Sequence, residues 1–273
     1  MELVLVLVIL VVMYVTVRSP WAGLLTGAVL GALLAPGGDG AAILTAAGVA
    51  GAGFLLGVRA RSRASPGRAI LLAGAPLGLA LGAWLAGDKA ATRASLEEWV
   101  RLHVGDALTA AWRSALVEYL PELLPAIGIL VGIGVVLLSY ALAVRLFRPL
   151  GIQLRPLGRL AELRLPFGMV WSFAAALLLA VVGRGAGARW LLLAGLNLGF
   201  VHGAAFFVEG LAIGRHFLEA RAMPGAMQLV FGLVALMMPM PLVVGGVGLF
   251  DLWFDFRRLT APPASGEGPA DRG

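Results

Sequence analysis

Eight long apolar stretches constrain this chain more than any other feature of its sequence. An α-helix needs about 20 apolar residues to cross the hydrocarbon core of a bilayer. Backbone polar groups inside lipid must be satisfied within the segment, which a helix achieves by itself. The sequence therefore predicts an all-α, polytopic transmembrane bundle of about eight spans, at residues 3–17, 21–35, 41–58, 69–87, 123–144, 167–183, 190–213 and 225–250.

Composition agrees with a lipid-facing surface. Only 13% of the 273 residues are charged and 60% are hydrophobic, whereas a soluble domain carries about 25% charged residues. Cysteine is absent, which excludes disulfides, thiolate catalysis and cysteine-bound metals. The pI near 10.9 could suggest nucleic acid, but the basic residues lie mostly in short loops between apolar stretches, so we predict no nucleic-acid partner.

The loop charges predict an orientation. By the positive-inside rule, loops rich in Arg and Lys face the cytoplasm. Alternate loops carry twelve basic and two acidic residues on one side and six basic and eight acidic residues on the other. We therefore expect the loops at 59–68 and 145–166 to be cytoplasmic, the segment 88–121 to be exported, and the protein to lie in a bacterial plasma (inner) membrane.

The last apolar stretch does not fit the regular alternation of loops between the two sides of the membrane. Eight spans that start outside would leave Arg257 and Arg258 outside, against the rule. Pro239 and Pro241 interrupt this stretch, so a broken or re-entrant hairpin would return the C-terminus to the cytoplasm. The sequence leaves both possibilities open.

The chain is predicted to form one membrane-embedded helical domain, 1–259. Its exported segment 88–121 has a capping box, Ser95 with Glu98, followed by an apolar stripe, typical of an amphipathic helix lying on the membrane surface. A bend is expected at Gly105, and the segment is either a surface linker or a lid over a central cavity. Residues 260–273 are rich in Pro, Ala, Ser and Gly and are expected to be disordered.

Two spans carry small residues at every fourth position. One series contains Gly27 and Gly31 and ends at Ala35; the other contains Gly78 and Gly82 and ends at Ala86. Such faces let helix backbones approach closely in lipid. The two segments also align with each other, so either a duplication or coincidence in an Ala/Gly/Leu-rich chain explains them.

Three polar residues lie at membrane depth on the seventh predicted span: Asn197, His202 and Glu209. At 100° per residue, His202 and Glu209 share a face and Asn197 points elsewhere. Ionisable groups in a bilayer usually face a protein interior or a wet cavity. The pair is therefore either interhelical packing or a ligand or proton contact, with Arg145 and Arg215 as candidate partners of Glu209.

A second polar group follows the last span. Asp251, Asp255 and Arg258 share a helix face at spacings of four and three, among aromatic residues, which favours a salt-bridged structural clamp at the interface. Catalytic, cofactor and metal motifs are missing, and three scattered His do not form a metal site. An intramembrane protease would need Ser172 with His202, but Ser172 lacks the glycine setting of a nucleophile.

The stretches 207–213, 216–224 and 248–258 resemble the YybS-like family of uncharacterised bacterial integral membrane proteins. The closing Asp-x3-Asp-Phe-Arg element is the most specific part. This resemblance implies a distant likeness to the substrate-capture components of energy-coupling-factor vitamin transporters and to a rod-shape morphogenesis membrane protein. It implies no catalytic residues.

Two functional hypotheses follow. The first is a non-enzymatic membrane protein with a transport-like or small-molecule capture role, without a cofactor. The second is a scaffold that organises membrane or cytoplasmic partner proteins. The discriminating feature is whether His202 and Glu209 face a cavity or a packed seam.

Overall fold

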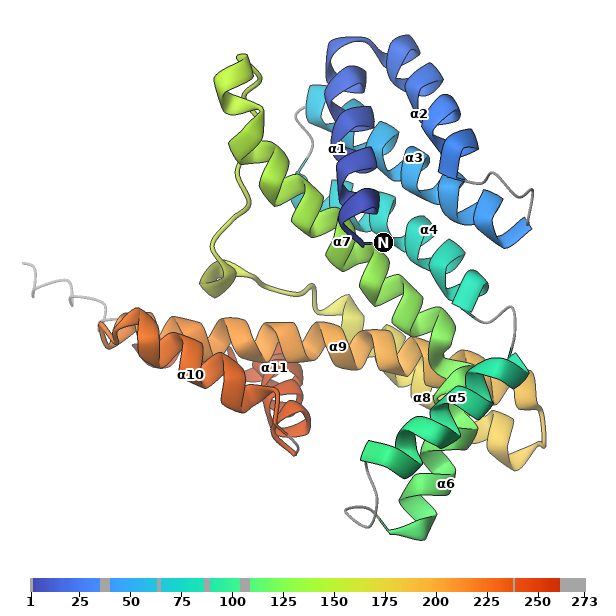
Figure 1. The fold of residues 1–273 in the computed structure, drawn as a ribbon. Coiled ribbons are helices and arrows are strands. Elements are labelled where there is room, and N and C mark those ends of the chain that lie inside the picture. The colour runs from blue at the N-terminus through green and yellow to red at the C-terminus, as the bar shows by residue number, and fades with distance from the viewer. Residues whose placement is uncertain are drawn as a thin grey trace, which may run out of the picture. The chain divides into compact units, whose positions relative to one another are not determined.

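The computed structural model is shown in Figure 1 and describes residues 2–34, 40–62, 65–85, 89–103, 109–237 and 239–260. Every regular element in these ranges is a helix, which confirms the predicted all-α class. Ala35, Ala86, Gly105 and the tail beyond 260 lie outside the described residues.

Five helices are long and apolar enough to cross a membrane. They are α3 (Gly40–Arg61), α4 (Pro66–Leu85), α7 (Leu124–Leu146), α8 (Gly168–Gly185) and α9 (Arg189–Ala220). The consecutive helices α10 (Gly225–Ala235) and α11 (Met240–Phe254) are bent by 105° and add a sixth if they form one broken span. The apolar helices α1 (Glu2–Arg18) and α2 (Pro20–Leu34) are shorter than a full span, so the count of eight stays a prediction.

The segment predicted to be exported forms two short helices, α5 (Lys89–His103) and α6 (Ala110–Tyr119). Trp99 and Leu102 are exposed on α5, and Arg101 pairs with Glu98 one turn earlier. Four 3-10 turns complete the described chain: η2 (Pro121–Leu123), η3 (Arg148–Leu150), η4 (Leu160–Glu162) and η5 (Phe256–Thr260).

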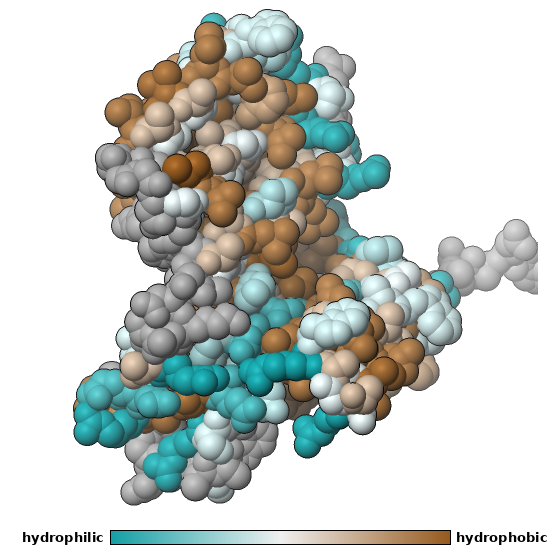
Figure 2. All heavy atoms as spheres, turned by 90° about the vertical axis from the view of Figure 1, so that its right-hand side faces the viewer, coloured by the Kyte–Doolittle hydropathy of each residue, from teal (hydrophilic) through white to brown (hydrophobic). Residues whose placement is uncertain are grey.

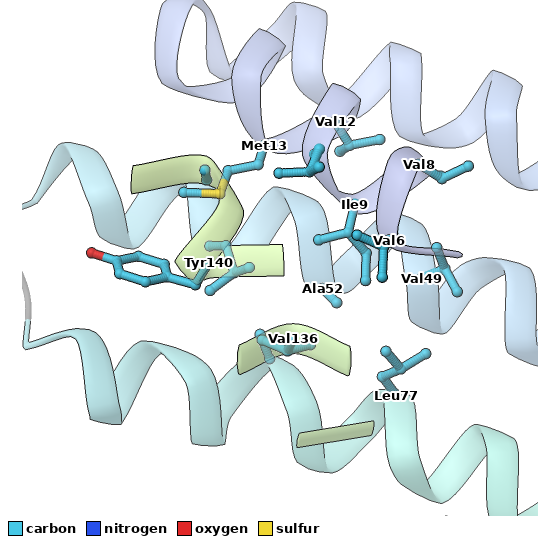
Figure 3. Close-up of a cluster of buried hydrophobic side chains, with 14 of the residues drawn as sticks. Val6, Val8, Ile9, Val12, Met13, Val49, Ala52, Leu77, Val136 and Tyr140 are labelled. Atoms are coloured by element: carbon cyan, nitrogen blue, oxygen red, sulfur yellow. The ribbon is translucent and has the colours of Figure 1, made fainter. Parts of the chain in front are cut away.

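The chain divides into two compact units. Unit 1 comprises residues 1–157 and 176–201, and unit 2 comprises 158–175 and 202–273, so the boundaries run within α8 and α9. The core of unit 1 lies among α1, α3, α4 and α7, which all contribute buried apolar side chains (Figure 3). Ile9, Val12, Met13 and Val136 are fully buried there.

Glycines bring α4 and α7 into backbone contact. A Cβ added to Gly78 would lie 2.5 Å from the Gly128 carbonyl oxygen, and one on Gly82 would lie 2.8 Å from Pro125 Cα. The two helices can cross this closely only if these positions are glycine, because a real Cβ does not approach other atoms at such distances. The other ladder packs less tightly: a Cβ on Gly27 would lie 3.4 Å from Ala50 Cβ, and one on Gly31 would lie 3.7 Å from the Ala46 oxygen.

The exposed surface of the described helices is largely apolar. Leu25, Trp21, Trp171 and Val181 are each more than 65% exposed, and hydrophobic residues cover much of the visible face in Figure 2. A water-soluble protein rarely presents apolar patches of this extent. A bilayer supplies the missing cover.

Candidate functional site

Asn197 joins the N-terminal third of α9 to the start of α7. Its Oδ1 accepts the backbone N–H of Ala126 at 3.0 Å, and its Nδ2 donates to the carbonyl oxygens of Glu122 (2.8 Å) and Leu193 (2.9 Å). Glu122 also pairs with Arg189 at 3.0 Å. The amide therefore supplies partners for backbone groups at a helix start, where intrahelical partners are missing.

His202 contacts α8 rather than Glu209. Its Nε2 lies 2.6 Å from the hydroxyl oxygen of Ser172, and that hydroxyl donates to the Met169 carbonyl at 3.1 Å. Phe173 and Phe206 lie beside the imidazole in tilted orientations, with ring centroids 6.2 and 6.4 Å from it. Serine and histidine are thus brought together in unit 2, a pairing that the glycine-poor setting of Ser172 argued against at the level of sequence.

Glu209 is the most buried charged residue in the described chain, with a side chain 1% exposed. Its Oε1 accepts a hydrogen bond from Arg257 Nη2 at 2.7 Å, and its Oε2 accepts the backbone N–H of Leu165 at 3.1 Å. Arg257 is itself only 4% exposed. Both carboxylate oxygens are therefore engaged, as burial of a charge requires.

The predicted partners of Glu209 were wrong. Arg145 is exposed at the end of α7, and Arg215 pairs with Glu219 at 2.9 Å. Arg257 comes 48 residues after Glu209, and no helical periodicity links positions so far apart. The only sequence signal was that Arg257 is a charged residue directly after an apolar span, a position where interfacial arginines are common.

Asp251 and Asp255 shape the end of α11. Asp251 Oδ1 accepts the backbone N–H of Phe256 at 2.7 Å. Asp255 is the C-cap, with φ of 44° in the left-handed region, a conformation that Asp and Asn tolerate better than most residues. This turn redirects the chain into η5, and so it presents Arg257 to Glu209.

The Asp255 carboxylate also binds two arginines. Arg258 Nε lies 2.8 Å and Arg164 Nη1 lies 3.3 Å from its Oδ2. Partial burial pushes the Asp255 pKa upward, but the hydrogen bonds and charges of these two arginines outweigh it, so the pKa lies below its ordinary value. In the same unit, Glu219 pairs with Arg159 as well as with Arg215.

These contacts define one structural feature, which we call the C-terminal clamp: Glu209, Arg257, Asp251, Asp255, Arg164 and Arg258. It joins three segments that are distant in sequence, namely α9, the loop before α8 and the end of α11. Aromatic contact reinforces it, since Phe167 meets Trp253 edge to face at 6.0 Å. The clamp is a charge-balanced joint between helices.

No group of three or more His, Asp or Glu side chains in the described ranges has a geometry that could hold a metal ion. One pocket of the described structure lies between α2 and α3 in unit 1, and its lining is apolar. Within unit 2, His202 and Glu209 contact different partners, Ser172 and Arg257 respectively.

Long apolar helices, an apolar exterior and polar residues that join helices to each other define a polytopic α-helical membrane protein. The family described as a predicted membrane protein (DUF2232) matches residues 95–252. The chain belongs to that family. The matched residues include Glu209 and Asp251 and end before Asp255 and Arg257. No curated protein and no solved structure matches the chain.

Proposed function

We propose that this protein is a non-enzymatic scaffold of a bacterial plasma membrane, which organises membrane or cytoplasmic partner proteins. One observation carries the proposal: the three candidate ligand residues use their polar atoms to join helices. Glu209 has both oxygens engaged by Arg257 and Leu165, Asn197 bonds to α7, and His202 bonds to Ser172. A capture role for these residues would need polar atoms presented to a ligand.

The proposal includes a topology of seven crossings and one re-entrant hairpin. Arg257 and Arg258 reach Glu209 and Asp255, and Asp255 also binds Arg164 from the loop before α8. That loop belongs to the segment predicted to be cytoplasmic. A hairpin of α10 and α11 that enters and returns would bring the C-terminus to the same side, in agreement with the positive-inside rule. The resemblance to the YybS-like family supports the same bacterial setting.

The experiment compares folding with biological activity for variants of the joining residues. Complementation of a deletion strain is scored for His202→Ala and Asn197→Leu, beside the thermal unfolding of each purified variant in detergent. A scaffold should lose activity only in proportion to lost folded protein. A His202→Ala variant that folds like the parent and is inactive would instead indicate a ligand or proton contact.

A direct search for partners completes this test. In cells that express the full chain, photo-crosslinkers placed at exposed positions such as Arg155 and Arg221 should capture the same partner repeatedly. Unreacted chain at every position, together with saturable binding of a small molecule to the purified protein, would overturn the scaffold proposal.

A second candidate function, a membrane serine hydrolase, is favoured by the short distance between Ser172 and His202. Ser172 Oγ and His202 Nε2 are 2.6 Å apart, within the range for a nucleophile and its general base. A membrane serine hydrolase should react with a fluorophosphonate probe at Ser172, and Ser172→Ala should abolish labelling. The scaffold proposal expects no labelling of the parent, because the Ser172 hydroxyl donates its proton to the Met169 carbonyl oxygen within the helix.

A further inference from the structure

The pocket between α2 and α3 has no part in the C-terminal clamp or in the scaffold proposal. Its volume is about 580 Å³, within the range of roughly 300–1,000 Å³ that holds small ligands. Small residues form its floor, among them Gly27, Gly31, Ala47 and Gly51. A Cβ added to Gly51 would meet nothing within 4 Å, so the groove is open at that point.

The length of the groove corresponds to one leaflet. Its lining on α2 runs from Gly23 to Ala32, about 14 Å at a rise of 1.5 Å per residue. One leaflet of hydrocarbon is about 15 Å thick. A helix about 10 Å wide would occupy roughly 1,000 Å³ over that length, nearly twice the groove volume, whereas an extended acyl chain is slimmer.

One end of the groove leads to a strongly basic surface. On α3 the lining residues Ala47, Gly51 and Phe54 share a helix face, and Arg61 follows on that face seven residues after Phe54. On α2 the corresponding position is Trp21, which is 79% exposed. Tryptophan and arginine at a helix end are typical of the headgroup region.

The positive charge at this end of unit 1 is not balanced by carboxylates. The helix ends meet there, since Arg61 donates to the Val17 carbonyl at 3.4 Å and Arg18 donates to the Leu150 carbonyl at 3.1 Å. In the described chain none of the exposed arginines of this surface has an ion pair with Asp or Glu: Arg18, Arg59, Arg61, Arg68, Arg145, Arg148 and Arg155.

Unit 2 provides the contrast. Five of its six described arginines pair with a carboxylate, namely 159, 164, 215, 257 and 258, and only Arg221 has no ion pair with a described Asp or Glu. An unpaired arginine surface attracts anionic headgroups, and a guanidinium binds phosphate through two parallel hydrogen bonds. The occupant should therefore carry an anionic group at the arginine-rich end of the groove and an apolar chain along the groove itself.

We propose that the groove between α2 and α3 binds one anionic phospholipid, with an acyl chain against Gly27 and Gly51 and the phosphate at Arg61. The bound lipid fills the open seam between these helices. It comes from the leaflet that faces the basic surface, which is the cytoplasmic leaflet under the predicted orientation. The site is independent of the scaffold proposal, because it shares no residue with the C-terminal clamp.

The test uses the full chain, purified in mild detergent and stripped of lipid. Phosphatidylglycerol and phosphatidylcholine with the same acyl chains are added separately, and bound lipid is counted by native mass spectrometry beside the thermal midpoint. We expect one retained phosphatidylglycerol, a raised midpoint, and at least tenfold weaker retention of phosphatidylcholine. Glycerol 3-phosphate, which has no acyl chain, should produce neither effect.

Paired variants locate the site. Gly51→Leu fills the groove and should lower phosphatidylglycerol retention at least tenfold, whereas Gly134→Leu on α7 places the same side chain in open space and should not. Ala47→Leu, at an exposed lining position, is a second filling variant if Gly51→Leu fails to fold. Arg61→Gln should weaken retention severalfold, whereas Arg184→Gln, at an exposed arginine on the predicted outer side, should change it little.

Three outcomes would overturn the proposal. Equal retention of the two lipids would remove the headgroup contact, and undiminished retention by both filling variants would remove the groove. A dimer, or a copurified membrane subunit, that Gly51→Leu disrupts while lipid binding stays unchanged would make a partner helix the occupant.

Discussion

The buried carboxylate of Glu209 illustrates, at the scale of a residue, how a charge is kept inside an apolar helix. Desolvation of a carboxylate costs several kcal/mol, and here an arginine and a backbone N–H offset it. Each is supplied by a different segment, so the charge is stable only when all three segments are in place. Variants of the Glu209 ion pair should therefore reveal, through a change in stability, whether the C-terminal clamp is formed.

Loss of Arg257 should therefore lower the stability of unit 2 far more than loss of its neighbour Arg258. Arg257→Gln leaves Glu209 buried without its cation and should lower the free energy of unfolding by about 3–5 kcal/mol. Arg258→Gln is the matched control: its side chain is 83% exposed, and such surface pairs contribute about 0–1 kcal/mol.

Both variants are measured by chemical unfolding of the full chain in detergent. A Glu209→Gln, Arg257→Met double variant removes both charges and should recover much of the lost stability. Equal stability of Arg257→Gln and Arg258→Gln would show that the buried pair is not formed.

Asp255 should give the clamp a dependence on acidic pH. Its folded pKa lies below the ordinary value of 3.8, so the carboxylate stabilises the folded state above pH 3.8. That contribution is lost as pH falls from there through the folded pKa. Asp255→Asn keeps a residue suited to the positive φ but removes the charge.

The thermal midpoints of the parent and of Asp255→Asn should consequently differ at pH 6 and approach each other progressively as pH falls below about 4. A difference that is constant from pH 6 to pH 3 would mean that the charge of Asp255 contributes nothing.

At the scale of the helices, the small-residue series differ in how closely they bring two helices together. The α4–α7 crossing is a contact between backbones, because Gly78 and Gly82 on α4 face Gly128 and Pro125 on α7. The α2–α3 pair has the same kind of sequence pattern but leaves a groove. A periodic series of small residues thus permits close approach without enforcing it, since the partner helix decides the distance.

The two glycine series should accordingly differ in their tolerance of a methyl group. Gly78→Ala drives a Cβ into the backbone of α7 and should lower stability by about 1–3 kcal/mol, the usual cost of overpacking. Gly27→Ala meets Ala50 at 3.4 Å, an ordinary contact, and should stay within about 0.5 kcal/mol of the parent. Thermal unfolding and the yield of monodisperse protein measure both. Similar losses at the two sites would contradict the packing described here.

At the scale of the whole molecule, the contacts of η5 bear on membrane topology. The clamp links the C-terminal end of α11 to the loop before α8. Both must then lie on one side of the membrane.

The topology is tested by single cysteines in a chain that has none of its own. Ser62→Cys and Thr260→Cys should react with an impermeant thiol reagent from the cytoplasmic side, and Ala94→Cys from the outside. Inverted vesicles and intact cells provide the two orientations. Reaction of Thr260→Cys from the same side as Ala94→Cys would exclude the re-entrant hairpin.

The sequence by itself determined the membrane class, the helical fold and the position of the apolar helices, because hydrophobic length and backbone hydrogen bonding in lipid leave few alternatives. The position of Asn197, His202 and Glu209 within an apolar stretch also marked them as unusual, since polar groups at membrane depth are rare. Tertiary structure alone decided their partners. Ser172 and Arg257 come from segments 30 and 48 residues away, and a side chain meets such partners through helix packing and the left-handed turn at Asp255, which no periodicity encodes.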